Sequence, residues 1–433
     1  MAIQALFVIL AVLLSLLFLG VPISYAIAVS SLTAILSSID LNVAVLTAAQ
    51  RTFVGMSKFS LTAIPFFILA GNIMNQGGIA KRLVDFVMSI LGRLPGALLI
   101  TNIGTNALFG AISGSASAAA AAVGSMIRDG AEEQGYDPAV TAATNSASAC
   151  SGLLIPPSNA LITYSLASGG TSVAALFMAG YIPGIIWALC CCVVGVLLAR
   201  HLGYQGIPGK FDWKKLGVCT LRALPSLSLI VVVIGGIVGG VFSATEGSAI
   251  AVVYSLVLAF CYRSINLKSL WKIIVDSAKM SGMVVFLVGV SNILGWVMAF
   301  LQIPDAVAAA LLSLTDNQYV ILLIMNVILL VAGTFMDVTP AILIFTPLFL
   351  PICRSFGMTS IQFGLILVYN LCIGNITPPV GNALFVGIKV GRTTLAKVMP
   401  YMLLYYAAIL CGLLLVTYIP AISLALPQMT GLA

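Results

Sequence analysis

Two proline pairs mark the segments of the chain where a binding site is most expected. One pair lies in Ile155-Pro156-Pro157-Ser158-Asn159 and the other in Thr377-Pro378-Pro379-Val380-Gly381-Asn382, each inside a long apolar stretch. Proline lacks an N–H group and clashes with the carbonyl four residues earlier, so each pair should break a helix and release two carbonyl groups. Within a bilayer such groups need a protein, water or ion partner, so a broken helix at this depth predicts an ion or solute site. The released carbonyls belong to Gly152, Leu153, Gly374 and Asn375.

Two other interrupted segments could supply further oxygen atoms. Residues 96–127 are interrupted by Ser113-Gly114-Ser115, and the second half of the chain contains a similar polar interruption at 333–340. Each predicts a helical hairpin that enters the membrane, turns near its midplane and leaves on the same side. We expect each hairpin tip to meet one proline break. Hydroxyl and carbonyl oxygens suit Na⁺, and the N-terminal ends of half-helices suit a carboxylate.

A simpler interpretation is that the small residues serve helix packing and the prolines only kink their helices. For one break alone the two interpretations are evenly matched. Two breaks in register, each with its own hairpin, favour a functional site.

Asp337 is an acidic residue at the depth of the second hairpin tip. A carboxylate at that depth is costly, so the default interpretation is a functional site. The alternative is that Asp337 caps a helix beginning at Pro340, since Asp is a favoured capping residue. Glu246 is less informative, because a carboxylate at a helix start is ordinary.

Composition places these segments in a membrane protein. The chain has 433 residues, of which 61% are hydrophobic and 7% charged, against about 25% charged in soluble domains. Apolar runs long enough to span a bilayer recur from end to end, which indicates an all-α polytopic protein. The net charge of +7 fits cytoplasmic loops rich in Lys and Arg better than nucleic-acid binding. The nine cysteines and the single histidine show no metal-ligand or catalytic spacing, so we do not expect an enzyme.

The two proline pairs are 222 residues apart (156 and 378), and other features align at nearly the same offset. We therefore divide the chain into a first repeat at 1–205, a cytoplasmic linker at 206–222 and a second repeat at 223–433. An odd number of spans, five in each repeat, predicts that the second repeat is inverted. Asp137, followed by Pro138, should begin the first broken helix.

The remaining elements follow from apolar runs and amphipathic stripes. In the first repeat we expect membrane helices at 3–19 and 22–38, an amphipathic segment at 42–57, a third spanning helix at 60–76 and an amphipathic helix at 79–93. The hairpin at 96–127, the broken helix up to Ala167 and a last helix at 173–200 follow. In the second we expect helices at 224–240 and 244–261, an interfacial arm at 264–279, a helix at 282–300, a polar turn near Asp305, the hairpin, a broken helix at 360–388 and a last helix at 398–419.

The distribution of basic residues predicts the orientation. With the linker in the cytoplasm, 16 of the 19 Lys and Arg residues fall on that side, as the positive-inside rule favours. Only Arg51, Lys58 and Arg354 fall outside. Both termini are then predicted to be periplasmic.

Four motifs resemble the large membrane subunit of TRAP (tripartite ATP-independent periplasmic) transporters. They are Ala63-Ile64-Pro65-Phe66-Phe67-Ile68-Leu69-Ala70-Gly71, Gly110-Ala111-Ile112-Ser113-Gly114-Ser115, Ile155-Pro156-Pro157-Ser158 and Asn375-Ile376-Thr377-Pro378-Pro379-Val380-Gly381. The resemblance covers essentially the whole chain. It implies an elevator-type secondary transporter for organic acids in a bacterial inner membrane, coupled to two or more Na⁺ ions and without an organic cofactor. It also implies two partners, a small four-helix membrane subunit and a periplasmic substrate-binding protein.

The resemblance and the two clusters together give the candidate residues. The first predicted sodium site comprises Ser113, Gly114, Ser115, Gly152, Pro156, Ser158 and Asn159. The second comprises Gly333, Thr334, Asp337, Gly374, Thr377 and Gly381. Candidate substrate contacts are Ser117, Asn159, Thr339 and Asn382. One departure is that Asn159 follows the Pro-Pro-Ser motif and Ser165 stands near a position where many family members have Gly.

These observations predict the permease subunit of a sodium-driven, binding-protein-dependent importer of a sugar acid, such as sialic acid, or of a C4-dicarboxylate. A stand-alone carboxylate transporter of the same architecture is the first alternative. An ion channel is disfavoured by the paired hairpins. An intramembrane enzyme is disfavoured by the lack of a nucleophile–base pair.

Overall fold

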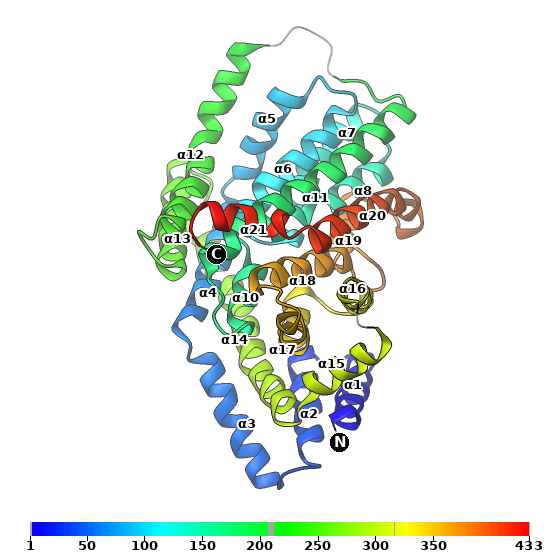
Figure 1. The fold of residues 1–433 in the computed structure, drawn as a ribbon. Coiled ribbons are helices and arrows are strands. Elements are labelled where there is room, and N and C mark those ends of the chain that lie inside the picture. The colour runs from blue at the N-terminus through cyan, green and yellow to red at the C-terminus, as the bar shows by residue number, and fades with distance from the viewer. Residues whose placement is uncertain (1, 207–211, 316, 433) are drawn as a thin grey trace.

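The computed structural model describes residues 2–206, 212–315 and 317–432, and all regular elements in these ranges are helices (Figure 1). Seven of them are long and apolar enough to cross a membrane, or up to eight if the bent pair at Leu41–Met56 and Phe59–Gln76 forms one span. The predicted all-α membrane fold is therefore confirmed at this level.

The first half begins with a series of helices that precede its hairpin. They are α1 (Ala2–Phe18), α2 (Ile23–Ile35), α3 (Leu41–Met56), the short η1 (Phe59–Thr62), α4 (Ala63–Gln76) and α5 (Ile79–Leu91). The hairpin follows as α6 (Ala97–Ser113) and α7 (Ala116–Glu133), and the broken helix as α8 (Pro138–Ala149), α9 (Ser151–Leu154) and α10 (Asn159–Ala167). The long α11 (Val173–His201) ends this half.

The second half presents a similar order of elements. It begins with α12 (Trp213–Val238), α13 (Ala244–Cys261), α14 (Leu267–Phe300) and α15 (Ile303–Leu314). The second hairpin is α16 (Gln318–Phe335) and α17 (Val338–Ser355), and the second broken helix is α18 (Ser360–Gly374) and α19 (Asn382–Val390). The chain closes with α20 (Leu395–Tyr418) and α21 (Pro420–Met429). Both Pro-Pro peptide bonds, at 156–157 and 378–379, are cis.

The two halves interlock at the breaks. The first arm of each hairpin packs on the broken helix of its own half, α6 on α8 and α9, and α16 on α18. The second part of each broken helix also packs on the second arm of the other hairpin, α10 on α17 and α19 on α7. This crossed packing brings both hairpin tips and both breaks to the centre of the molecule.

Four boundaries differ from the sequence-based expectations. The arm at 264–279 and the helix at 282–300 form one continuous helix, α14, because no proline interrupts the chain between them. The polar turn near Asp305 is instead the helix α15, which has Pro304 in its first turn. The helix expected at 224 begins at Trp213, since the Asp212 carboxylate accepts a hydrogen bond from the Lys215 N–H and caps it. The C-terminal α21 was not expected.

Part of the predicted linker at 206–222 is therefore helical, and Lys210 lies outside the described residues. Other local predictions hold. The Asp137 carboxylate accepts a hydrogen bond from the Ala139 N–H and caps α8. Glu246 forms a capping box with Ser243 at the start of α13.

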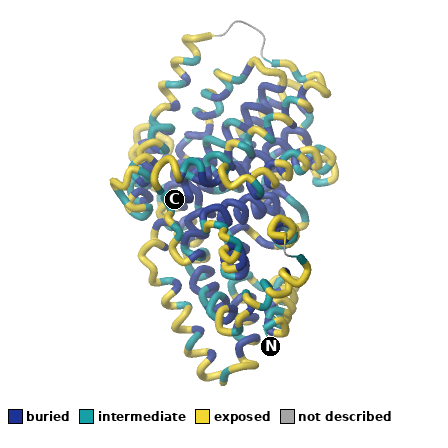
Figure 2. The backbone as a smooth tube through the Cα atoms, in the orientation of Figure 1, coloured by how far each residue is buried: buried dark blue, intermediate teal, exposed yellow. Residues whose placement is uncertain are grey.

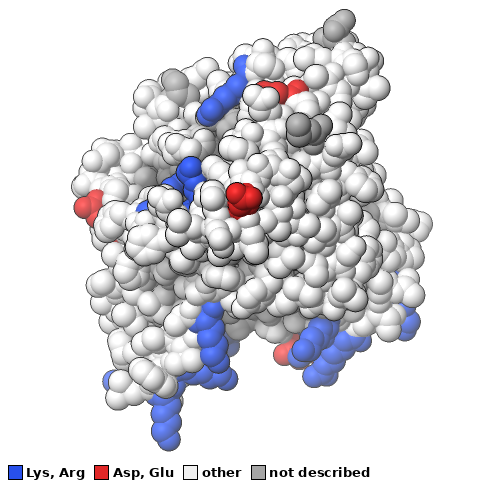
Figure 3. Space-filling view, turned by 90° about the horizontal axis from the view of Figure 1, so that it is seen from below, with Lys and Arg blue, Asp and Glu red and all other residues white. Residues whose placement is uncertain are grey.

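The surface is that of a protein that contacts lipid. Large apolar side chains are exposed on the outer helices, among them Phe7, Leu46, Val231 and Trp271, while the buried positions concentrate on the hairpins and broken helices (Figure 2). In Figure 3, Lys and Arg side chains project along the lower edge of the view. Uncharged surface separates them from a smaller group of Lys and Arg side chains at the upper left.

Candidate functional site

A cavity of about 100 Å³ lies where the hairpin tips meet the breaks, and we call it the central cavity. One part of its wall is polar and comes from both halves of the chain, with Gly114, Ser115, Ser117, Asn159, Thr163, Asp337, Thr339, Asn375 and Asn382. The opposing part is apolar and comes from α4 and α14, with Ile64, Ile68, Met280 and Val284. The cavity thus brings together polar residues from distant parts of the sequence.

In the first half, hairpin tip and break touch through glycine backbone. A Cβ atom placed on Gly114, which has a φ of +61°, would lie 3.1 Å from the Pro157 carbonyl oxygen and 3.3 Å from Asn159 Nδ2. On the other side of this tip, a Cβ atom on Gly71 of α4 would lie 2.9 Å from the Ser113 carbonyl oxygen. The first tip is therefore held between α4 and the first break.

The second half repeats this contact with different residues. The Val380 N–H, in the second break, donates a hydrogen bond of 3.2 Å to the Thr334 carbonyl oxygen at the second tip. Gly381, with a φ of +31°, is the N-cap residue of α19, and a Cβ atom there would lie 2.9 Å from the Thr377 carbonyl oxygen. The second tip and break thus form one packed unit.

Buried amide side chains hold each hairpin arm on its broken helix. Asn106 of α6 donates through Nδ2 to Asn145 Oδ1 at 3.1 Å and to Ser148 Oγ at 2.8 Å. In the second half, Asn370 of α18 donates through Nδ2 to Asn326 Oδ1 of α16 at 2.8 Å. Buried hydrogen bonds of this kind fix the relative position of two helices, because leaving such groups unpaired is costly.

The proline breaks release fewer carbonyl oxygens than their sequences predict. The Leu153 carbonyl accepts a hydrogen bond from Ser158 Oγ. The Gly374 carbonyl accepts from the Thr377 N–H at 2.9 Å, and the Asn375 carbonyl accepts from the Ala383 N–H at 3.1 Å. Three of the four carbonyls expected to be free therefore have a protein partner, because the chain turns back on itself after each break.

Two amide oxygens at the cavity lack such partners. The Oδ1 atoms of Asn159 and Asn375 are buried, and neither has a hydrogen-bond partner among the described residues. Both residues line the central cavity. A buried acceptor without a partner is costly, and a bound cation or a ligand hydroxyl would satisfy it. The cavity therefore offers oxygen atoms of the kind that a hard cation takes as ligands.

Asp337 occupies the N-cap position of α17, which begins at Val338 rather than at the expected Pro340. Its side chain makes no capping hydrogen bond and lines the central cavity. Capping by a side-chain hydrogen bond, the alternative role for this residue, is not found in the structure. The carboxylate is the only acidic group of the described part of the chain that lines this cavity.

The candidate residues divide into two groups. Gly114, Ser115, Asn159 and Asp337 of the predicted sodium sites line the cavity, together with all four candidate substrate contacts, Ser117, Asn159, Thr339 and Asn382. The others belong to the hairpins and the breaks but do not line the cavity: Ser113, Gly152, Pro156, Ser158, Gly333, Thr334, Gly374, Thr377 and Gly381.

Sequence reasoning missed Asn375 and Thr163 as cavity residues. Asn375 was considered only for its backbone carbonyl, although its place four residues before Pro379 already put its side chain at the break. Thr163 lies one turn after Asn159 on the same face of α10, a spacing that could have indicated it.

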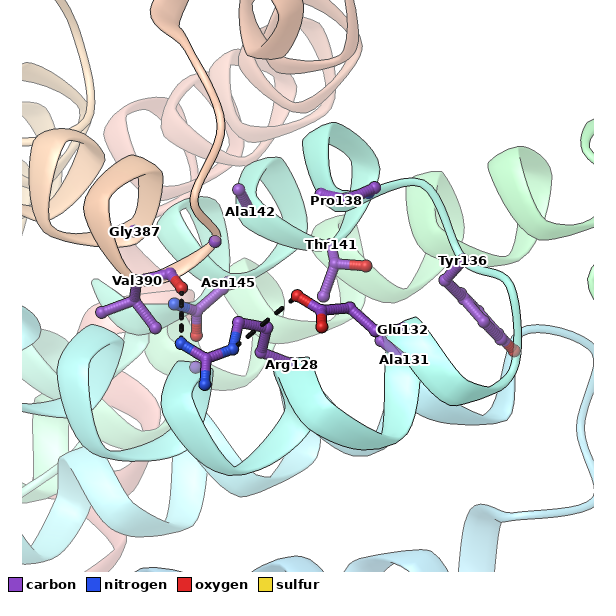
Figure 4. A pocket seen from close by; sticks show the side chains of 12 residues that line it. Arg128, Ala131, Glu132, Tyr136, Pro138, Thr141, Ala142, Asn145, Gly387 and Val390 are labelled. Carbon is purple, nitrogen blue, oxygen red and sulfur yellow. Dashed lines mark hydrogen bonds and ion pairs between the residues drawn. The ribbon is translucent and has the colours of Figure 1, made fainter.

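A further contact joins the two halves at the second arm of the first hairpin (Figure 4). Arg128 of α7 donates through Nη1 to the Val390 carbonyl oxygen at the end of α19, at 3.3 Å, and its Nε lies 3.8 Å from a Glu132 carboxylate oxygen. The cation thereby pairs with the carbonyl end of a helix, where positive charge is stabilising. This contact ties the first hairpin to the second broken helix.

Comparison with known proteins identifies the family. A family model described as "Tripartite ATP-independent periplasmic transporter, DctM component" matches residues 10–422. The chain belongs to this family. It is a TRAP large permease protein and thus a member of a family of transporters rather than enzymes.

Several relatives of this TRAP permease match over nearly their whole length. YgiK of Salmonella typhimurium is 50% identical over 410 residues, which cover 95% of this chain and 94% of the relative. The C4-dicarboxylate TRAP transporter large permease protein DctM of Pseudomonas aeruginosa is 38% identical, covering 93% of each chain. The sialic acid TRAP transporter large permease protein SiaM of Vibrio cholerae is 32% identical, covering 96% of this chain and 97% of the relative.

A solved structure supports the fold. The crystal structure of the Alcanivorax borkumensis YdaH transporter matches with a TM-score of 0.60 over 88% of each chain, at 16% sequence identity. At this identity the likeness concerns the fold alone.

Proposed function

We propose that this TRAP permease is the membrane subunit of a sodium-coupled importer of an organic acid, a sugar acid such as sialic acid or a C4-dicarboxylate. The observation that carries the proposal is the central cavity, where polar residues of both hairpin tips and both breaks face one another. This is the place where ion and solute meet in transporters built from broken helices.

The charges at the cavity support coupling to a cation. Asp337 brings a carboxylate to the cavity without a capping partner, and the Oδ1 atoms of Asn159 and Asn375 add two acceptors. A sodium ion at these oxygens would offset the cost of burying them. An acidic solute would then enter a cavity whose negative charge is already neutralised, so each ligand should favour binding of the other.

The division of the cavity wall supports an elevator movement. The polar wall belongs to the hairpins and broken helices, which are tied together by crossed packing and by Arg128. The opposing wall, from α4 and α14, is apolar. We propose that the hairpins and broken helices move as a body along this apolar wall, which offers no polar partner that would hold them in one position.

The proposed transporter has two partners and a defined orientation. A small four-helix membrane subunit and a periplasmic substrate-binding protein complete the tripartite system, in a bacterial inner membrane with both termini periplasmic. Two inverted repeats, 1–205 and 223–433, account for the similar order of elements in the two halves and for the 16-to-3 distribution of basic residues.

Reconstitution tests the proposal. The permease is placed in liposomes with an inward sodium gradient, with and without its small subunit and binding protein, and uptake of labelled succinate and N-acetylneuraminate is measured. Uptake of one acid that needs both partners and the sodium gradient is the expected result. Uptake by the permease alone would favour a stand-alone carboxylate transporter, and uptake insensitive to sodium would contradict the coupling.

A further inference from the structure

A second cavity, of about 370 Å³, lies between α3 and α14 on one side and α10 and α17 on the other. We call it the outer cavity. Two basic side chains, Arg51 and Lys58, line it, and no acidic residue does so in the described part of the chain. The Arg51 guanidinium carbon lies 5.8 Å from the centre of the Trp296 ring, which also lines the cavity.

The two basic residues are unusual in their position. They are two of the only three Lys and Arg residues that the charge distribution places on the periplasmic side, and the third is Arg354. Within the described residues, no carboxylate lies within ion-pair distance of Arg51 or Lys58. Unpaired positive charge that faces a concave, partly apolar wall concentrates anions there.

The outer cavity continues the central cavity along the same helix faces. On α14, Met280 and Val284 line the central cavity, and Val288 and Gly295 line the outer one. These positions recur every three to four residues, or a multiple of that spacing, so they form one stripe along the helix. At a rise of about 1.5 Å per residue, Val284 and Val288 are only about 6 Å apart along the axis.

The other two helices show the same continuity. Thr339 of α17 lines the central cavity, and Leu343 and Pro347, one and two turns later, line the outer cavity. Thr163 of α10 lines the central cavity, and Leu166 lines the outer one. Three helices thus lead from the basic residues to the hairpin tips.

We propose that the outer cavity is a periplasmic binding site for the organic anion, where Arg51 and Lys58 hold the carboxylate before it moves to the central cavity. The proposal rests on the proposed function for the direction of movement. The site itself follows from the two unpaired cations, the concave wall and the continuous helix faces. A lipid phosphate would present a similar negative group to the same cations, so the test separates the two sources.

A cysteine at Gly295 gives a probe inside the cavity. A Cβ atom at this position meets no neighbouring atom within 4 Å, so the substitution fits without strain. Gly295→Cys is placed in the full chain with the exposed Cys261 and Cys411 replaced by serine, in phosphatidylcholine nanodiscs. Its reaction rates with an anionic sulfonatoethyl and a cationic trimethylammonioethyl methanethiosulfonate are compared, with the parent chain as background.

The anionic reagent should react faster, and Arg51→Gln with Lys58→Gln should lower the anionic-to-cationic rate ratio on the order of tenfold. Arg354→Gln removes a charge from the same side without touching the cavity and should leave the ratio unchanged. Succinate, as a carboxylate probe, should slow the anionic reagent more than chloride does at equal ionic strength, and only when both cations are present.

Three results would overturn the proposal. They are a ratio unaffected by the double substitution, equal slowing by succinate and chloride, and a fall in the ratio with half of the lipid as phosphatidylglycerol that occurs only when Arg51 and Lys58 are present. The last would identify a lipid phosphate as the occupant. Because no step measures transport, the reactivity results stand even if the reconstituted transporter carries neither acid.

Discussion

Gly374 of the second broken helix lies against Gly333 of the second hairpin, so close that a Cβ atom at 374 would come within 2.5 Å of the Gly333 Cα atom. Gly152 and Gly110 form the matching contact in the first half, at 2.3 Å from a Cβ at 152 to the Gly110 Cα atom. Real Cβ atoms do not approach that closely, so the first hairpin reaches its break only because Gly110 and Gly152 are both glycine, and the second because Gly374 is.

Gly152→Ala should therefore separate the first hairpin from its break. The methyl group meets backbone that cannot turn aside, and overpacking of this kind costs about 1–3 kcal/mol. We expect a lower thermal unfolding temperature in detergent and strongly reduced uptake in liposomes.

Gly235→Ala is the matched control, because a Cβ atom there meets nothing within 4 Å. In a helix interior this change should be neutral or stabilising by up to about 1 kcal/mol. If Gly152→Ala were as stable and active as Gly235→Ala, the close glycine contact would not determine the position of the hairpin.

The tip–break pairing was accessible from sequence because it depends on local rules. Pro156-Pro157 and Pro378-Pro379 cannot continue a helix, and Ser113-Gly114-Ser115 is too polar and too flexible for a simple span. Asp137 and Glu246 precede or begin their helices as capping residues should.

The features that sequence reasoning missed depend on the path of the chain in space. Nothing in the local sequence shows that Ala383 N–H returns to the Asn375 carbonyl, so that carbonyl was expected to be free. The convergence of both candidate sites on one cavity, through the packing of α10 on α17 and α19 on α7, is likewise a tertiary property. The apolar wall from α4 and α14 carries no motif of its own.

The proposed orientation predicts which parts of the chain react with an external reagent. Gly217→Cys lies in the first turns of α12, where a Cβ atom meets no neighbour, and Gln428→Cys is exposed near the C-terminus. In intact cells an impermeant maleimide should label position 428 and spare position 217, while both should react after permeabilisation. The opposite pattern would reverse the assignment of the two membrane faces.

Asn375→Ala separates a structural role from a ligand role. The wild-type Oδ1 atom is buried without a partner in the described structure, and its Nδ2 atom makes only a long contact of 3.9 Å with Cys150 Sγ. Removing an unpaired buried acceptor should leave the free energy of unfolding unchanged or raise it, by up to about 1–3 kcal/mol. If the oxygen serves the ion or the solute, uptake should fall while the unfolding temperature holds or rises.

Asn370→Ala provides the contrast, since its Nδ2 atom donates to Asn326 Oδ1 and to the Ile366 carbonyl oxygen. Its Oδ1 atom is unpaired like that of Asn375, but the loss of the two donated bonds should lower stability. A stable Asn375→Ala protein with normal uptake would exclude this oxygen from ligand binding.

Asp337→Asn tests the proposed coupling to sodium. A carboxylate at the membrane midplane costs at least about 2.5–3.5 kcal/mol on insertion scales. The N-terminal end of α17 offsets typically about 0.3–1 kcal/mol of this, and the Asp337 side chain makes no capping hydrogen bond that would add to it. The proposed cation would offset the remaining cost. Asn keeps the shape and one oxygen but removes the charge, so the sodium concentration needed for half-maximal uptake should rise at least tenfold while expression and assembly are unchanged.

Glu246→Gln is the control, because Glu246 only caps α13 and is fully exposed. The sodium response of this variant should match that of the wild type. An unshifted sodium response in Asp337→Asn would mean that this carboxylate does not hold the coupling ion.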